Sequence, residues 1–237
     1  MKWEENMRKK IIVIIFILLF FGDTITAIKI DDVNVTSIRE VTNKKSGIAD
    51  LKPGDILFQI SQYIAMHCII FKQYNSTSKM YEFIEANSDH GVRRILYSEN
   101  ELNNTIIYKK FARVKNANAT QKQNALLFAE AQIGKEFEWD FLFHNKNNIP
   151  DSPNDPFSNA WYCTELVWAA YYNCNHSPEE KIYGEGIDID RNEWRKDSLI
   201  YSMVWPNNIL RDDDVEVFYL GKNRNYNFPD NILYNFL

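Results

Sequence analysis

A cysteine at the start of an apolar segment is the residue of this chain best suited to chemistry. Cys163 follows Trp161 and Tyr162, and the mainly apolar residues 164–171 after it are typical of a helix. A helix N-terminus offers unpaired N–H groups and a partial positive charge, and both favour a thiolate over a thiol. The same N–H groups can stabilise the oxyanion that forms when a thiolate attacks a carbonyl. The alternative is a structural residue, because free cysteine is often buried in the core.

A thiol nucleophile needs a base, and the base needs a group that orients it. Of the four histidines, His67 stands apart because the strand-like run around it, residues 66–71, is apolar on both faces. The other three lie in polar, turn-like segments and are expected to be solvated: His90, His144 and His176. A buried histidine is more often a hydrogen-bonded core residue than a catalyst, and it needs a polar partner in either case.

Glu85 is the candidate for that partner. It shares one face of the predicted strand at residues 80–86 with two aromatic side chains, and a carboxylate there is costly to bury unless it is paired. A hairpin centred on Ser76 would place His67 directly opposite Glu85, with Cβ atoms about 4.5–5.5 Å apart. A slip of two residues would leave the pair diagonal and within reach, whereas a slip of one would put them on opposite faces.

Two other carboxyl groups near these residues have plainer interpretations. Glu82 lies on the opposite face of the strand from Glu85 and is expected to point to water. Glu165 follows the cysteine closely, and its expected role is favourable charge in the first turn of the helix. The sequence therefore predicts Cys163 as the nucleophile, His67 as the base and Glu85 as the orienting carboxylate.

Composition narrows the class of protein. The 237 residues are 45% hydrophobic and 14% aromatic, which is enough for a core, and the net charge of −5 argues against nucleic acid or anionic lipid as a main partner. The three cysteines do not make a disulfide scaffold, although Cys68 and Cys174 could pair in a secreted protein and leave Cys163 free. No CxxC, HExxH or calcium-loop motif is present, so neither a metal nor an organic cofactor is expected.

Residues 1–27 are typical of a secretory signal. Four basic residues lie among the first ten, an unbroken apolar run spans residues 11–21, and a small or polar exit ends at Ala27. The apolar run is short for a membrane span, so the cleaved protein is expected to be secreted or extracytoplasmic, without stable membrane association. An uncleaved membrane anchor is the alternative. Residues 28–50 are expected to form an irregular arm, and residues 51–237 are expected to form one domain.

Strands precede helices in the predicted order. Short runs rich in Ile, Phe, Tyr and Val, separated by turn residues, indicate strands at residues 55–60, 66–71, 80–86, 92–96 and 105–114. Two helices and a late strand follow, at residues 121–133, 163–174 and 215–220. Polar loops are expected at residues 144–159 and 179–192. This order of elements predicts an α+β fold.

Several pieces of the chain carry a family resemblance. They are Leu-Lys-Pro-Gly-Asp-Ile-Leu-Phe at residues 51–58, the His67 strand, residues 84–86 with 91–92, residues 134–141, Tyr-Cys-Thr-Glu-Leu-Val-Trp at residues 162–168 and, more weakly, residues 205–208. With these pieces the chain resembles the YiiX-like branch of the NlpC-type papain-like hydrolases, in which the papain order is circularly permuted and the histidine precedes the cysteine. The resemblance implies a small antiparallel sheet packed against helices, with a triad of Cys163, His67 and Glu85. It also implies hydrolysis of amide or ester bonds, with cell-wall peptides or acylated small molecules as substrates.

Two other functions stay open. A lipid acyltransferase resembling lecithin retinol acyltransferase uses the same thioester chemistry, and it would need an apolar tunnel beside Cys163. A binding module could keep the fold without the chemistry, but the intact triad residues speak against it. The long loop at residues 144–159 and an inserted segment at residues 179–197 are both expected to border the cleft.

Overall fold

The computed structural model describes residues 47–61, 65–105, 108–139, 160–182, 184, 186–191 and 204–220. The predicted signal at residues 1–27, most of the predicted arm and the predicted loop at residues 144–159 therefore lie outside the described residues. The end of the arm is described, and there Ile48–Asp50 form a turn of 3-10 helix (η1) where irregular chain was expected. Within the described part of the chain, no helix is long and apolar enough to cross a membrane.

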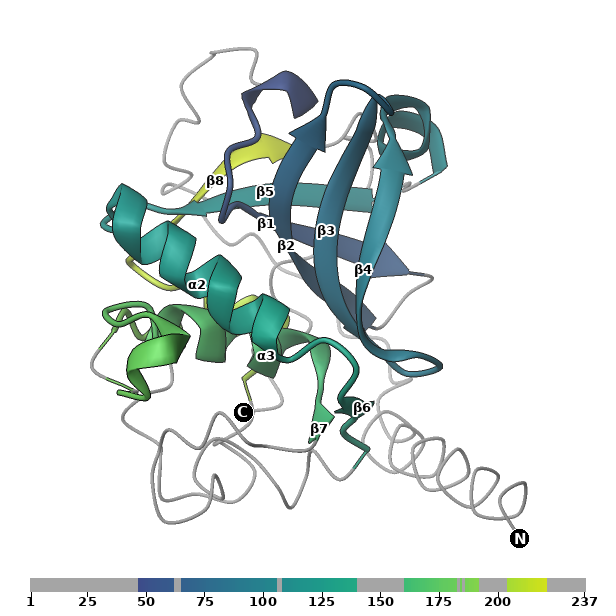
Figure 1. Ribbon diagram of the computed structural model, residues 1–237. Coiled ribbons are helices and arrows are strands. Elements are labelled where there is room, and N and C mark those ends of the chain that lie inside the picture. Colours follow the sequence, from purple (N-terminus) through teal and green to yellow (C-terminus); the bar gives the residue numbers. More distant parts are fainter. Residues whose placement is uncertain are drawn as a thin grey trace, which may run out of the picture. The chain divides into compact units, whose positions relative to one another are not determined.

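A six-stranded sheet forms the centre of the described fold (Figure 1). Its strands are β1 (Ile56–Ser61), β2 (Ala65–Asn75), β3 (Met80–Asn87), β4 (Gly91–Ser98), β5 (Tyr108–Val114) and β8 (Val215–Leu220). They lie in the order β4-β3-β2-β1-β5-β8, and every neighbouring pair is antiparallel. All six predicted strands are present. β5 begins later than expected because Glu101–Thr105 form a π-helix (η2).

Two predicted helices, α2 (Ala119–Ala131) and α3 (Cys163–Tyr172), lie side by side against one face of this sheet (Figure 1). A capping box starts α2, because Asn118 and Gln121 each accept the other's backbone N–H. Four shorter elements were not predicted: β6 (Glu136–Phe137), β7 (Ala160–Trp161), η3 (Pro178–Glu180) and α4 (Pro206–Leu210). The antiparallel sheet with its few helices confirms the predicted α+β class.

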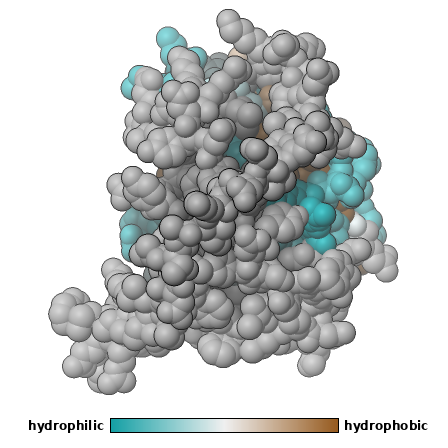
Figure 2. Space-filling model, turned by 180° about the vertical axis from the view of Figure 1, so that it is seen from behind, coloured by the Kyte–Doolittle hydropathy of each residue, from teal (hydrophilic) through white to brown (hydrophobic). Residues whose placement is uncertain are grey.

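Both faces of the sheet bury apolar side chains. The face toward α2 and α3 carries residues such as Ile56, Phe58, Cys68, Ile70 and Ile84. The intervening residues of the same strands, such as Leu57, Ile69, Phe71 and Phe83, form a second cluster on the other face. Burial on both faces explains why these strands read as nearly continuous apolar runs in the sequence. In the view from behind, hydrophilic residues make up most of the described surface that is visible (Figure 2).

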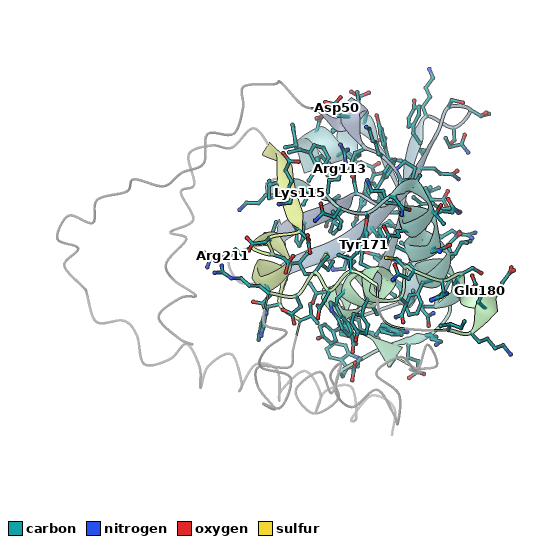
Figure 3. The ribbon with its side chains drawn as sticks, turned by 90° about the vertical axis from the view of Figure 1, so that its left-hand side faces the viewer. Asp50, Arg113, Lys115, Tyr171, Glu180 and Arg211 are labelled. Atoms are coloured by element: carbon teal, nitrogen blue, oxygen red, sulfur yellow. The ribbon has the colours of Figure 1, made fainter. Side chains whose placement is uncertain are left out.

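The start of β1 is fixed by a buried ion pair. Asp55 is fully buried, and its two carboxylate oxygens accept hydrogen bonds from Arg113 of β5 at 2.7 and 2.6 Å. Arg113 also donates to the backbone oxygen of Asp50 at 2.9 Å (Figure 3). The hydroxyl of Tyr171 in α3 donates to the carbonyl of Gly54. These contacts connect β1, which pairs with β2, to β5 and to the helix that begins at Cys163.

Candidate active site

Cys163 is the first residue of α3, as the sequence predicted. Tyr162 before it has extended backbone angles (φ −95°, ψ 165°) and provides no side-chain cap. The N–H groups of the first turn therefore donate no hydrogen bond to the N-cap side chain, and they lie at the positive end of the helix dipole. Cys163 is half-buried, whereas Cys68 and Cys174 are fully buried. Of the three thiols, Cys163 is the one with access to a substrate.

All three cysteines are free, so the suggested disulfide between Cys68 and Cys174 is absent. The backbone N–H of Cys68 instead donates a hydrogen bond to the sulfur of Cys163. Cys174 lies just beyond the other end of α3, so the helix separates it from Cys68. The contact brings β2 to the nucleophile and adds a backbone donor that favours its thiolate.

His67 lies between the thiol and a carboxylate. Its Nε2 is 2.6 Å from Oε2 of Glu85, and its imidazole is also hydrogen-bonded to the thiol of Cys163. Glu85 is almost completely buried, with 2% of its side chain exposed, while 23% of the His67 side chain is exposed. The structure thus brings the three predicted site residues together from β2, β3 and α3. Their catalytic roles stay a prediction.

The electrostatics of this cluster favour an ion pair. Burial alone would raise the pKa of the Cys163 thiol, but its hydrogen bond to His67, the charge of His67 and the N–H groups of Cys68 and Thr164 lower that pKa below its usual value. Burial acts against the charged imidazole, yet Cys163 and Glu85 together raise the pKa of His67 to about 9. A thiolate beside an imidazolium is the reactive form of a cysteine nucleophile.

Glu85 is held as a carboxylate from two sides. Burial acts to raise its pKa, but the hydrogen bonds and charges of His67 and Arg93 outweigh burial and lower it. Arg93 in β4 lies directly opposite Glu85, and its Nε donates to Oε1 at 2.8 Å. Each oxygen of Glu85 therefore has its own donor. The sequence analysis missed Arg93, although the pairing of β3 with β4 would have pointed to it.

The hairpin that joins β2 and β3 does not have the predicted register. Its last pairs are Ile70 with Ile84 and Phe71 with Phe83, whereas the hairpin centred on Ser76 required Phe71 opposite Tyr81. The difference is two residues at these pairs but three nearer the turn, where Gln73 pairs with Glu82. A β-bulge between Phe71 and Gln73 reduces the offset from three residues to two. A slip of two keeps side chains on their original faces. His67 and Glu85 are consequently diagonal neighbours, and they still meet.

A polar row extends this pair across the sheet. Gln59 of β1 lies opposite His67, and its side-chain amide donates to the hydroxyl of Tyr97 at 3.2 Å. Tyr97 belongs to β4, as does Arg93, and the charges of Glu85 and Arg93 both act on its hydroxyl. The row therefore runs from β1 to β4 on the face that carries His67. The residues of this polar row lie on different strands, so no local pattern in the sequence predicted the row.

Both residues beside the nucleophile hold one residue of a distant segment. The hydroxyl of Thr164 donates to the carbonyl of Val204 at 2.5 Å, and the N–H of Val204 donates to the hydroxyl of Tyr162 at 2.9 Å. Val204 precedes α4, and the resemblance had reached this part of the chain only weakly. These two hydrogen bonds hold the start of α3 against the segment that leads into β8.

Two carboxyl groups differ from the sequence interpretation. Glu82 does not simply point to water, because it accepts a hydrogen bond from Gln73 at 2.7 Å and pairs with Lys72 at 3.3 Å. Glu165 does not supply charge to the helix. Burial and the neighbouring Glu138 raise its pKa well above the usual range, which favours the neutral acid. In both cases the deciding partners come from other parts of the fold, and the local sequence did not reveal them.

The two other described histidines, His90 and His176, do not join the site. His90 is exposed, and His176 is 3.3 Å from Glu180 near η3. His144 lies outside the described residues. Among the residues that are described, no group of three or more His, Cys, Asp or Glu side chains is placed to hold a metal ion.

The geometry can be compared with known proteins. The family model described as permuted papain-like amidase enzyme, YaeF/YiiX, C92 family, matches residues 50–219. The chain belongs to this family. The protein is therefore a member of a papain-like cysteine amidase or peptidase family, and the YiiX-like resemblance of the sequence is confirmed. Searches of curated proteins and of solved structures give no match.

The C92 match spans the described sheet and helices, from Asp50 at the end of η1 to Tyr219 in β8. It contains Cys163, His67 and Glu85 in the permuted order, with the histidine before the cysteine. The permuted papain-like fold and the enzyme class are thereby established.

Proposed function

We propose that this C92 protein is a secreted thiol-dependent hydrolase of amide or ester bonds, with Cys163, His67 and Glu85 as its catalytic triad. The observation that carries the proposal is the position of His67, which hydrogen-bonds the thiol of Cys163 and lies 2.6 Å from a carboxylate oxygen of Glu85. A nucleophile, a base and an orienting group in contact are the requirements of covalent acyl transfer.

In the first half of the reaction, the Cys163 thiolate attacks the substrate carbonyl and forms a sulfur–carbon bond. The carbonyl oxygen becomes an oxyanion, and the N–H groups at the start of α3 are positioned to stabilise it. His67 then transfers its proton to the leaving amine or alcohol, and the bond between the carbonyl carbon and that group breaks. A thioester remains on Cys163, and His67 is neutral.

In the second half, neutral His67 takes a proton from water, and the oxygen of that water attacks the thioester. The sulfur–carbon bond breaks, the carboxylic acid leaves, and the thiolate and imidazolium are restored. Glu85 accepts a hydrogen bond from Nε2 of His67, so it fixes the ring orientation and stabilises the imidazolium. Arg93 keeps Glu85 ionised while it does so.

Cell-wall peptides and acylated small molecules are the substrates that we propose, in keeping with a site outside the cytoplasm. Support for that location comes from the signal-like residues 1–27. A lipid acyltransferase would share the first half of the reaction, but an acceptor other than water would release the acyl group. Product analysis separates these two outcomes.

The test is capture of the acyl-enzyme by intact-protein mass spectrometry, after mixing with activated acyl esters and with short peptide amides. We expect a stoichiometric mass increase that maps to Cys163 and decays as free acid appears. Cys163→Ala should abolish both the adduct and the turnover, and Cys174→Ala, at the far end of α3, serves as the matched control. An adduct that forms equally in Cys163→Ala would refute the proposal.

A further inference from the structure

Glu138 and Glu165 form a buried pair of carboxyl groups that the triad does not use. Only 7% of Glu138 and 2% of Glu165 is exposed. Glu138 directly follows β6, and Glu165 lies in the first turn of α3, two residues after Cys163. Their carboxyl groups lie within hydrogen-bonding reach of each other, and this contact adds to burial in raising the pKa of Glu165. Two ionised carboxylates have only acceptors, so a hydrogen bond between them needs a proton on one of the two.

The surroundings of Glu165 favour that proton. Its Oε2 meets no hydrogen-bond donor among the described residues, which is costly for a buried carboxylate. A proton on Glu165 would make its carboxyl group a donor, and the neighbouring Glu138 offers an acceptor. The same contact recurs in aspartic-protease dyads, where two close carboxyl groups retain one proton.

The other titratable groups around the pair are mostly acidic or neutral. The charges of Glu138, Glu165 and Asp190 act together on the buried hydroxyl of Tyr162. Asp190 has 1% of its surface exposed and comes from the segment after η3. The Cys163 thiolate lies two residues from Glu165, and the imidazolium of His67, which is hydrogen-bonded to that thiolate, offsets its charge. Among the described residues, Lys135 is a further cation near β7, with its ammonium 5.9 Å from the Trp161 ring centre.

The pair also lies where the start of α3 is fixed. Glu165 accepts the backbone N–H of Tyr162, the N-cap residue, in the manner of half a capping box. The backbone N–H of Glu138 donates to the carbonyl of Trp161 at 3.1 Å, beside the parallel pairing of β6 with β7. The two carboxyl groups thus connect the β6 segment to the chain on both sides of Cys163.

We propose that Glu138 and Glu165 share one proton and act as positioning residues, which hold the first turn of α3 and the Cys163 nucleophile in place. Loss of the proton would leave two negative charges side by side in a buried site and would loosen the start of the helix. The catalytic part of this inference rests on the proposed function. The sharing of the proton does not, and it can be measured without turnover.

The first experiment compares thermal unfolding of the wild type, Glu165→Gln and the exposed control Glu179→Gln between pH 5 and pH 8. An acid whose pKa is raised on folding stabilises the native state at low pH, and this stabilisation is lost as pH rises toward the folded-state pKa. The side-chain amide introduced by Glu165→Gln is permanently neutral and can still donate to Glu138. We therefore expect the Tm difference between wild type and Glu165→Gln to change by about 5 °C or more across this range, and Glu179→Gln to parallel the wild type. Parallel curves for all three proteins would overturn the shared proton.

The second experiment tests positioning with Glu165→Leu, which keeps the volume but removes the contacts with Tyr162 and Glu138. We expect its kcat to fall by about tenfold or more with little change in KM, and Glu165→Gln to restore most of the loss. If Glu165→Leu does not fold, the pH dependence of Glu165→Gln decides alone. A kcat within twofold of wild type for folded Glu165→Leu would refute positioning. An inactive wild type would instead refute the proposed function, while the unfolding curves would still report on the proton.

Discussion

His67 and Glu85 meet through a contact of 2.6 Å although they are diagonal, not opposite, neighbours on β2 and β3. The pairing of β2 with β3 ends at Ile70 and Ile84, so neither His67 nor Glu85 belongs to a recorded pair of these two strands, and their side chains can meet diagonally. Beyond that point the side of β2 that faces β3 is open to Cys163, whose sulfur accepts the N–H of Cys68. The end of the ladder therefore gives the imidazole access to the thiol and to the carboxylate at once.

The first prediction concerns this carboxylate. Glu85→Gln keeps the shape and can still accept a hydrogen bond, but it removes the charge that stabilises the imidazolium. We expect kcat to fall about 10²–10⁴-fold, as when the orienting carboxylate is removed from other hydrolase triads. Glu82→Gln is the control three residues away, and it should lower the melting temperature slightly through its contacts with Lys72 and Gln73 while kcat is unchanged. Steady-state kinetics on both variants decides the matter, and the reverse pattern would assign the role to Glu82.

The second prediction is that Cys163 alone is alkylated rapidly by iodoacetamide at pH 6. Its pKa is lowered by His67 and by two backbone N–H groups, so part of it is thiolate even in mild acid. Cys68 and Cys174 are fully buried, and burial raises the pKa of both thiols. Peptide mapping after timed alkylation measures each site. His67→Ala should slow the labelling of Cys163, and equal labelling of all three cysteines would contradict the assigned site.

The third prediction is a bell-shaped dependence of kcat/KM on pH. Activity should rise in acid as Cys163 loses its proton below the usual thiol pKa, and fall again near pH 9 as His67 loses its own. The two limbs belong to the coupled pair, since each group shifts the other. Because Glu85 raises the pKa of His67, Glu85→Gln should move the alkaline limb to lower pH. An alkaline limb that stays in place in this variant would show that Glu85 does not act on His67.

Much of this site could be predicted because the signals were local. The apolar run after Cys163 and the alternation in the strands are properties of neighbouring residues, and they located α3, β2 and β3 correctly. The predicted register was wrong by three residues near the turn, and the bulge between Phe71 and Gln73, which no local pattern predicts, reduces the error to two residues before His67. The predicted contact survived because a slip of two preserves the faces of both strands.

The parts that the sequence did not reveal depend on partners far along the chain. The raised pKa of Glu165 depends on burial and on the charge of Glu138, which no local pattern connects to the helix. The strands β6 and β7 have two residues each, too few for a period to be visible. The two hydrogen bonds to Val204 join side-chain hydroxyls to backbone groups. Such groups are common in every sequence, so these contacts could not be predicted. Side-chain chemistry pointed to Cys163 as the candidate nucleophile, but the contacts that hold it in place became visible only in the fold.

The fourth prediction concerns processing. If residues 1–27 are a secretory signal, the mature protein should begin near Ile28. N-terminal mass spectrometry of protein purified from its natural source measures this directly. A chain that retains Met1 and needs detergent to stay in solution would indicate an uncleaved anchor instead.

The fifth prediction concerns the joint between β4 and β6. Gly91 has a positive φ of 66°, and a Cβ there would lie 2.2 Å from the backbone oxygen of Lys135. That oxygen accepts the N–H of Val92 at 2.9 Å, so it cannot move without loss of a hydrogen bond. We expect Gly91→Ala to cost about 1–2 kcal/mol for the backbone conformation and a further ~1–3 kcal/mol for the clash. Gly134 is the matched control, because its φ is also positive at 92° but nothing lies within 4 Å of the added Cβ.

Gly134→Ala should therefore show the conformational cost alone, about 1–2 kcal/mol. Urea unfolding of both variants gives the two free energies, and their difference isolates the contact with Lys135. Since this joint leads directly to Glu138 behind the first turn of α3, Gly91→Ala should also slow the alkylation of Cys163 at pH 6 more than Gly134→Ala does. Equal destabilisation by the two alanines would mean that β4 and β6 are not held together at Gly91.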